Sequence, residues 1–275
     1  MSLKNILVYV DDSKRAEGTV AAACALARQH DAHLTGLAIE RPPYIPGFAT
    51  IEIPPSAMEI ITRQRAATIA RAKEIFDAGV AKAGRTAQSG WTAEKGHTLE
   101  TLSLRSRYTD VTVVPQATPE MRGTADEDLV DDFVMTSGRP VLVIPYIGGT
   151  ESFGGTVLVA WNASRESARA VADAMPLLEH ASSVEVLVVE PRSMGDVPGA
   201  DIAAHLARHG IEAKANVTQG LDIEVGDVLL NRAADIGANL IVMGGYGHSR
   251  MRELVLGGAT RHILDHMTVP VLLSH

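Results

Sequence analysis

The sequence predicts an α/β protein made of two doubly wound domains in tandem, and two observations support this fold class. Short apolar runs alternate along the chain with amphipathic stretches of about ten residues or more, which is typical of parallel sheets covered by helices on both faces. The same succession of elements also occurs twice, as in a chain built from two copies of one module. The predicted domains span residues 1–148 and 154–275.

The repeat is clearest at the first strand of each domain. The apolar run 6–10 precedes the polar cluster Asp11-Asp12-Ser13 and an alanine-rich helical stretch. The apolar run 157–161 precedes Asn162-Ala163-Ser164 in the same way. Apolar residues then recur at helical spacing over 168–178, which predicts the order strand, turn and amphipathic helix.

Further strand candidates occur in matching positions of both domains. These pairs are 33–39 with 184–189, 110–114 with 239–243, and 139–144 with 269–273. The glycine-rich stretch 146–155 lacks the lysine of a phosphate-binding P-loop, so we interpret it as the linker. Residues 41–55 contain five prolines, which predicts a surface excursion before a long helix that begins near Ser56.

The composition excludes several classes of protein. With 275 residues, of which 46% are hydrophobic, the chain has ample material for a core. A formal net charge of -8 argues against nucleic acid or an anionic membrane as the main partner. Cys24 is the single cysteine and lies in an alanine-rich helical stretch, so we expect a buried thiol and no intrachain disulfide. No apolar run resembles a signal peptide or a membrane helix, and we expect a cytoplasmic protein.

The candidate binding loops are those at the strand ends. In doubly wound sheets, ligands bind beyond the carboxyl ends of the strands, where the strand order reverses. The loop after Met243 holds two glycine clusters, 244–247 and 257–258. Glycine admits positive φ and lets a ligand approach the backbone, and the helical run 261–266 after the second cluster offers free N–H groups to a phosphate. The alternative, with about half the weight, is that both clusters are only turns.

At this point the chain resembles the universal stress proteins in their tandem form. Gly244, Gly247 and Gly257 match the family's nucleotide-binding pattern of Gly, two residues, Gly, nine residues, Gly, then Ser or Thr. The resemblance implies that each domain is a five-stranded parallel sheet flanked by helices, of the adenine nucleotide alpha-hydrolase-like type. It further implies a role in the stress response, and pairing of the two domains through their last strands, with a homodimer in addition.

The resemblance also implies an adenine nucleotide, ATP or AMP, alone or with Mg²⁺, in the C-terminal domain. Adenosine would meet Asn162, and Val189 and Met243 would flank the base. The glycine clusters with Thr260 would hold the phosphates, and His248 and Arg250 would supply charge. The full set of expected contact residues is Asn162, Ala163, Ser164, Val189, Met243, Gly244, Gly245, Gly247, His248, Arg250, Gly257, Gly258, Ala259 and Thr260.

Two residues depart from the family pattern. Gly258 stands where a Ser or Thr is expected, so a phosphate loses one hydroxyl contact. A hydrogen bond to a charged group contributes about 1.5–3 kcal/mol, so we expect affinity to be lower by about ten- to a hundredfold, with partial compensation by Thr260. Asn162 replaces the family's aspartate, and its amide binds adenosine without charge assistance.

The N-terminal domain keeps Asp11 but has Pro115-Gln116-Ala117-Thr118 in place of residues 244–247. Between Gln116 and Gly138 there are six acidic residues and one basic residue. Acidic groups repel a polyphosphate, so we expect no nucleotide in this domain. The simpler interpretation of the run as a solvated acidic face predicts the same.

Other side-chain patterns favour structural roles. His262 and His266 share a helix face at a spacing that zinc sites use, but no third ligand is evident, so a packed or solvent-facing pair is favoured. Asp11 and Asp12 are adjacent, their side chains diverge, and we expect Asp12 to cap the following helix. Trp161 is expected in the core.

No nucleophile elbow or catalytic triad is apparent, so we predict a regulatory nucleotide-binding protein without an enzymatic activity. Slow ATP hydrolysis is the enzymatic variant of this prediction. The alternative class is a stress-response scaffold that binds no nucleotide and acts through protein partners.

Overall fold

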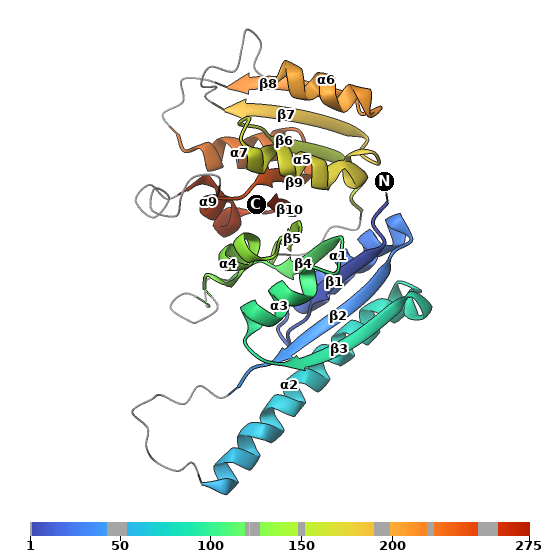
Figure 1. Cartoon of the computed structure of the whole chain (residues 1–275), viewed down its shortest axis with the longest axis vertical. Helices are drawn as coiled ribbons and strands as arrows, with labels where there is room; N and C mark the ends of the chain where they lie inside the picture. The colour runs from blue at the N-terminus through green and yellow to red at the C-terminus, as the bar shows by residue number, and fades with distance from the viewer. Residues whose placement is uncertain are drawn as a thin grey trace.

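One ten-stranded sheet runs through the whole molecule (Figure 1), in the order β3-β2-β1-β4-β5-β10-β9-β6-β7-β8. The computed structural model describes residues 2–42, 54–118, 121, 127–147, 152–189, 199–218, 223–246 and 258–275. From its outer edge inward, the N-terminal half has the order β3-β2-β1-β4-β5 and the C-terminal half the order β8-β7-β6-β9-β10. The strand order is therefore the same in both halves. All pairings within a half are parallel, and the central pairing of β5 with β10 is antiparallel.

The N-terminal half contains five strands, four α-helices and one short 3-10 turn in its described residues. The strands are β1 (Asn5–Tyr9), β2 (His33–Glu40), β3 (Ser89–Lys95), β4 (Val111–Pro115) and β5 (Val141–Ile144). The helices are α1 (Ala16–His30), α2 (Pro55–Lys82), α3 (Thr98–Ser106) and α4 (Leu129–Thr136), with the 3-10 turn η1 at Thr86–Gln88.

The described part of the C-terminal half repeats this succession. Its strands are β6 (Thr156–Ala160), β7 (Ser183–Val189), β8 (Ala213–Thr218), β9 (Ala238–Gly244) and β10 (Val271–Ser274). Its helices are α5 (Arg165–Leu178), α6 (Ala200–Arg208), α7 (Val225–Asp235) and α9 (Ala259–His266). The strand pairs expected from the repeat are confirmed. The outer strands β3 and β8 had no strand candidate in the sequence, because their side chains are polar and half-exposed rather than apolar.

Helices cover both faces of the sheet, so the doubly wound α/β fold is confirmed. One face packs against α1, α2, α5 and α6 and the other against α3, α4, α7 and α9. Each of the two core layers contains buried residues from both halves of the chain. Central strands such as β5 are apolar at every position because both faces of the sheet are covered. The hydrophobic core is therefore continuous across the molecule.

The two halves join where β5 meets β10. Val143 pairs with Val271 and Leu142 with Leu272, and all four side chains are buried. The expectation that the last strands of the two halves pair within the chain is confirmed. This pairing turns two five-stranded sheets into one and leaves β3 and β8 as the outer edges.

A buried histidine lies at the contact between the halves. His30 ends α1 and meets His180, which follows α5, with the ring centroids 5.1 Å apart. Neither ring nitrogen of His30 has a hydrogen-bond partner among the described residues, and only 3% of the residue is exposed. Burial first, and then the charge of His180, lower the pKa of His30 to about 4. The folded protein therefore holds a neutral imidazole at this contact.

Cys24 is buried, and burial raises the pKa of its thiol to about 11, which suits a structural rather than a reactive cysteine. Trp161 is half-buried and packs against the core.

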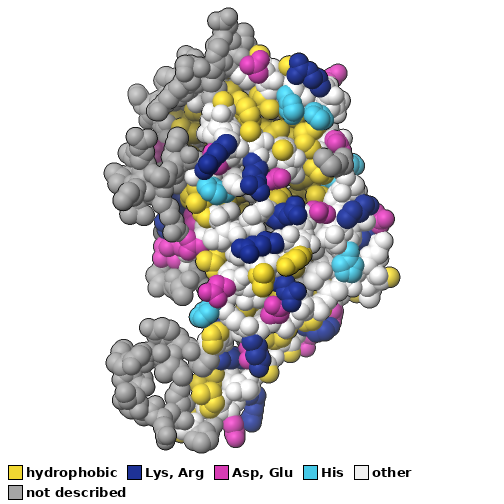
Figure 2. Space-filling view, viewed as in Figure 1, with side chains coloured by type: hydrophobic (Ala, Val, Ile, Leu, Met, Phe, Trp, Pro, Cys, Tyr) yellow, Lys and Arg dark blue, Asp and Glu magenta, His cyan; other side chains and the backbone are white. Residues whose placement is uncertain are grey.

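No helix in the described ranges is long and apolar enough to cross a membrane. On the face in Figure 2, basic and acidic side chains are interspersed.

The close approach of β2 to its neighbours makes Gly36 a sensitive position. A Cβ at Gly36 would lie 2.7 Å from Phe76 and 2.8 Å from Trp91, whose rings pack on each other. We expect Gly36→Val to lower the free energy of unfolding by about 1–3 kcal/mol through overpacking, measured by urea denaturation. Gly90→Ala on β3 is the control, since its Cβ meets only the exposed His33, and we expect a change within about 0.5 kcal/mol. Equal stability of both variants would contradict this packing.

The neutral state of His30 predicts that stability falls in mild acid. The unfolded chain binds a proton near the ordinary histidine pKa of 6.5, whereas the folded chain does so near pH 4. Stability is therefore complete above pH 6.5 and is lost as the pH falls towards 4, by about 3 kcal/mol in all. His30→Leu should remove this part of the pH dependence in urea titrations. The exposed His205→Gln should retain it, and an unchanged pH profile in His30→Leu would contradict the assignment.

Candidate functional site

The polar cluster after β1 (Asp11–Ser13) contains an ion pair between Asp11 and Arg15. Asp11 accepts hydrogen bonds from the Ser13 backbone N–H at 3.0 Å and from the Arg15 guanidinium at 2.9 Å. Burial alone would raise the pKa of Asp11, but the Arg15 charge and the bonds from Ser13 hold it below its usual value. Arg15 also donates to the carbonyl oxygen of Gln116 at 2.6 Å. The pair thus ties the end of β1 to the loop after β4.

Asp12 does not cap α1, and this expectation was wrong. Its carboxylate pairs with Arg71 of α2 at 2.6 Å, while the first residue before α1 is Arg15, which makes no side-chain capping bond. The physical reason is that α2 packs beside α1 and presents a cation to Asp12. Asp11 and Asp12 face different partners, so they form no acid/base pair.

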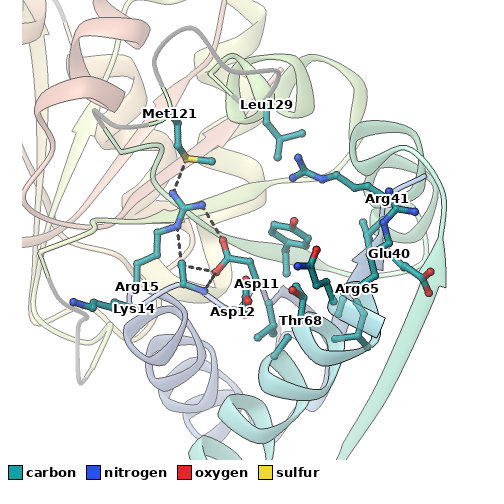
Figure 3. A pocket seen from close by; sticks show the side chains of 18 of the residues that line it. Asp11, Asp12, Lys14, Arg15, Glu40, Arg41, Arg65, Thr68, Met121 and Leu129 are labelled. Carbon is teal, nitrogen blue, oxygen red and sulfur yellow. Dashed lines mark hydrogen bonds and ion pairs between the residues drawn. The ribbon is translucent and has the colours of Figure 1, made fainter. Parts of the chain in front are cut away.

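A cavity of about 910 Å³ lies at the carboxyl ends of β1 and β2, beside α2 (Figure 3). Its lining combines apolar side chains with acidic and basic ones. The charged residues of the lining are Asp11, Asp12, Lys14, Arg15, Glu40, Arg41 and Arg65. No nucleotide was expected in this half. Arg41 near the prolines and Arg65 in the long helix were the available signal, although they follow Asp11 by 30 (41 − 11) and 54 (65 − 11) positions in the sequence.

At the described start of the loop after β4, neither Pro115 nor Gln116 offers a free N–H to a phosphate. Pro115 has no N–H, and the N–H of Gln116 donates to the Ile144 carbonyl at 2.8 Å. The Gln116 side chain is buried and donates to the Leu264 carbonyl at 2.7 Å, near the end of α9, while its oxygen accepts from the Tyr146 N–H at 3.0 Å. Gln116 therefore connects the two halves, where the sequence indicated only a lost glycine motif.

The acidic run of the N-terminal half lies against the C-terminal half. Glu127 and Asp128 reach Arg261 of α9 at 3.5 and 3.3 Å, and Asp131 accepts a hydrogen bond from the Tyr246 hydroxyl. Burial raises the pKa of Asp131 in spite of this bond. Asp128 is exposed, as the interpretation of the run as a solvated face predicts, whereas Asp131 belongs to the contact between the halves, because the junction of β5 with β10 brings α4 close to residues 245–246. The pairs with Glu127 and Asp128 partly compensate the charge of Arg261.

The loop after β6 is exposed and locally ordered. Asn162 accepts a hydrogen bond from the Ser164 N–H at 3.1 Å, and Ala163 adopts a positive φ of 56°. Ser164 caps α5 by accepting from the Ser167 N–H at 3.1 Å. Asn162 and Ala163 face solvent, so both are accessible to a ligand.

Gly244 and Gly245 are needed for packing, which differs from the expected role. Neither has a positive φ, which Tyr246 adopts instead at 53°. A Cβ at Gly244 would lie 2.6 Å from the backbone of Glu166, and one at Gly245 would lie 2.9 Å from Val134. The first glycine thus lets β9 approach the start of α5, and the second lets it approach α4.

The remaining expected contact residues occupy varied environments. Met243 is buried in the core, and Val189 is half-buried at the end of β7. Gly258 and Ala259 are half-buried at the start of α9, where Thr260 is buried. The other four, which are Gly247, His248, Arg250 and Gly257, lie outside the described residues.

The two halves carry opposite charges at the start of their first helix. Glu166 follows Asn162 by four positions, as Arg15 follows Asp11. Glu166 is buried and pairs with Arg165; burial would raise its pKa, but this bond and others hold the pKa below its usual value. The contacts of Glu166 with Gly244 would be made by its backbone and Cβ, and its carboxylate is paired with Arg165.

The histidine pair on α9 is held by carboxylates. His262 and His266 stack with centroids 4.5 Å apart, and His262 lies 2.7 Å from Asp227 and 3.3 Å from Glu224 on or before α7. Among the described residues, no group of histidine, cysteine and acidic side chains is arranged to hold a metal ion. The pair joins α7 to α9.

Known proteins share this architecture. Residues 155–275 match the model of the universal stress protein family, while no curated protein matches the chain. A universal stress protein from Archaeoglobus fulgidus DSM 4304 superposes with a TM-score of 0.72 at 14% identity, covering 98% of this chain and 95% of that one. A functionally unknown protein from Pseudomonas aeruginosa PAO1 gives a TM-score of 0.62 at 14% identity, covering 99% and 92%.

Both superpositions extend over nearly the whole chain, so the fold of both halves is shared at low identity. The family match is confined to the half that keeps the glycine spacing. Residues 155–275 are therefore similar to the universal stress protein family, and both halves of the chain share the fold of such a protein.

Proposed function

We propose that the protein is a regulatory module that binds an adenine nucleotide, ATP or AMP, in its C-terminal half. The observation that carries this proposal is the spacing of Gly244, Gly247 and Gly257 within the segment that matches the family model. The proposal requires no catalysis. The bound nucleotide supplies charge and hydrogen-bonding groups that a protein partner can recognise.

Sheet topology supports the location. Strand β6 has β7 on one side and β9 on the other, so the strand order reverses there, and ligands of doubly wound sheets bind at such a point. Ala160 pairs with Met243, which brings the loop 162–164 and the residues 244–245 to the same end of the sheet. The exposed Asn162 suits a contact with adenosine. The first N–H groups of α9, at Ala259 and Thr260, suit a phosphate.

The neighbouring acids favour a nucleotide complexed with a divalent cation. Glu127 and Asp128 of the N-terminal half are paired with Arg261 at the start of α9, so they lie near the proposed phosphate contacts. A Mg²⁺ ion on the phosphates reduces the repulsion by these carboxylates. We therefore expect ATP to bind more tightly in the presence of Mg²⁺.

The direct test combines two measurements on the purified protein. Denaturation followed by mass spectrometry identifies any nucleotide carried from the cell, and calorimetric titration of nucleotide-free protein with ATP and with AMP gives affinity and stoichiometry. One site per chain supports the proposal. No released nucleotide and no heat up to millimolar ligand would overturn it and favour the scaffold that acts through protein partners.

Substitution of the glycine loop tests the location. Gly247→Asp places a carboxylate among the proposed phosphate contacts, so we expect the calorimetric signal for ATP to disappear. The matched control is Thr118→Asp, the corresponding position after β4 in the N-terminal half, and it should leave ATP binding unchanged. Loss of ATP binding in Thr118→Asp alone would move the site to the N-terminal half.

Restoring the family's hydroxyl at position 258 should strengthen binding. Gly258 precedes α9 with φ of -57° and ψ of 146°, which serine adopts without strain. We expect Gly258→Ser to raise ATP affinity about tenfold through one hydrogen bond to a phosphate. Gly258→Ala adds a Cβ without the hydroxyl and is the control. Equal affinities of the Ser and Ala variants would show that no phosphate lies at this position.

A further inference from the structure

An arginine in the first turn of α9 is paired with acids from the other half of the chain. The guanidinium of Arg261 lies 3.5 Å from a carboxylate oxygen of Glu127 and 3.3 Å from one of Asp128. Both acids precede α4, which Figure 1 shows next to α9. Arg261 follows Ala259 and Thr260, whose N–H groups are the proposed phosphate contacts. A phosphate bound there would share this end of the helix with the Arg261 side chain.

The ion pairs of Arg261 are loose and open to solvent. Both distances exceed the length of about 2.7–2.9 Å that is typical of a charge-assisted hydrogen bond. The side chains of Arg261 and Asp128 are 52% and 57% exposed, and ion pairs exposed to this extent are weak because water and salt screen them. A phosphate carries more charge than one carboxylate and forms paired hydrogen bonds with a guanidinium. Phosphate is therefore a stronger partner for Arg261 than either acid.

Other contacts hold the acidic segment near α9 when these ion pairs break. Asp131, in the first turn of α4, accepts a hydrogen bond from the Tyr246 hydroxyl. Val134 of the same helix lies close against Gly245, where an added Cβ would be only 2.9 Å away. Both contacts join α4 to the end of β9 without Arg261. A change of partner by Arg261 is therefore local and leaves the two halves joined.

We propose that Glu127 and Asp128 regulate the nucleotide site of the C-terminal half by competing with phosphate for Arg261. This inference rests on the proposed nucleotide binding. Without nucleotide, Arg261 pairs with the two acids. With nucleotide, it pairs with a phosphate, and the acids are released from α9. The competition lowers nucleotide affinity, and the exchange transmits the bound state to the surface of the N-terminal half, where a protein partner can recognise it.

The test is a double-mutant cycle on the full chain, in which calorimetry measures ATP binding in the presence of Mg²⁺. We expect Glu127→Gln combined with Asp128→Asn to raise ATP affinity about three- to tenfold, because the competing carboxylates are removed. Arg261→Gln should lower affinity about tenfold. When Arg261→Gln is already present, the two acid substitutions should change affinity by less than about twofold, because no arginine remains to be released.

Glu74→Gln combined with Asp77→Asn is the matched control. Both residues are exposed on α2, which covers the opposite face of the sheet from α9, so this variant removes the same charge elsewhere. Its ATP affinity should stay within about twofold of the wild type. The proposal is overturned if the control gains as much affinity as the acid variant, or if the gain is the same with and without Arg261. Circular dichroism and thermal unfolding verify that each variant is folded.

Tripolyphosphate, titrated into the same proteins, separates failure of this inference from failure of the proposed function. It has the phosphate chain of ATP without the adenosine. If ATP binds and the acid substitutions leave its affinity unchanged, the nucleotide proposal stands and the competition is overturned. If tripolyphosphate shows the expected cycle and ATP does not bind, the competition stands and the adenine-nucleotide proposal fails. If no protein of the cycle binds either ligand, both proposals are overturned.

Discussion

The antiparallel pairing of β5 with β10 is the constraint on which the rest of the structure depends. Both strands have only four residues and every side chain in them is buried. The pairing satisfies the inner edge of each half, which would otherwise expose unpaired backbone groups. It also aligns the helices of both halves into two continuous core layers. The halves therefore behave as one sheet rather than as two modules on a linker.

This junction changes what the strand-end residues do. At the position after β4, Gln116 bonds to the end of α9; at the corresponding position after β9, Gly245 admits Val134 of α4. Arg15 connects to the same network because it donates to the Gln116 carbonyl while lining the cavity. Hydrogen bonds thus link the N-terminal cavity to α9 through Arg15 and Gln116. The first turn of α9 is where we propose that a phosphate binds. The loops after β4 and β9 therefore each contact the other half of the chain.

The two halves differ in the charged groups that lie near the ends of their strands. The N-terminal half has Arg15 where the C-terminal half has the buried Glu166, and its cations lie on side chains rather than on a glycine-rich backbone. The C-terminal half retains the glycine spacing, and Arg261 at the start of α9 is paired with Glu127 and Asp128 of the N-terminal half. The glycine-rich arrangement of the C-terminal half is the one for which we propose an adenine nucleotide.

The sequence by itself determined the fold class and most strand positions, because buried strands of a covered parallel sheet are continuous apolar runs and because the pattern repeats. The pairing of the last strands was implied only by the resemblance to universal stress proteins. It did not locate β3 and β8, whose half-exposed polar strands carry no such signal. Only the tertiary structure decided the cavity beside α2, the packing role of Gly244, and the contact of Asp131 with Tyr246. These features join residues far apart in the chain, and their partners are set by helix packing and by the β5–β10 junction, which local patterns do not encode.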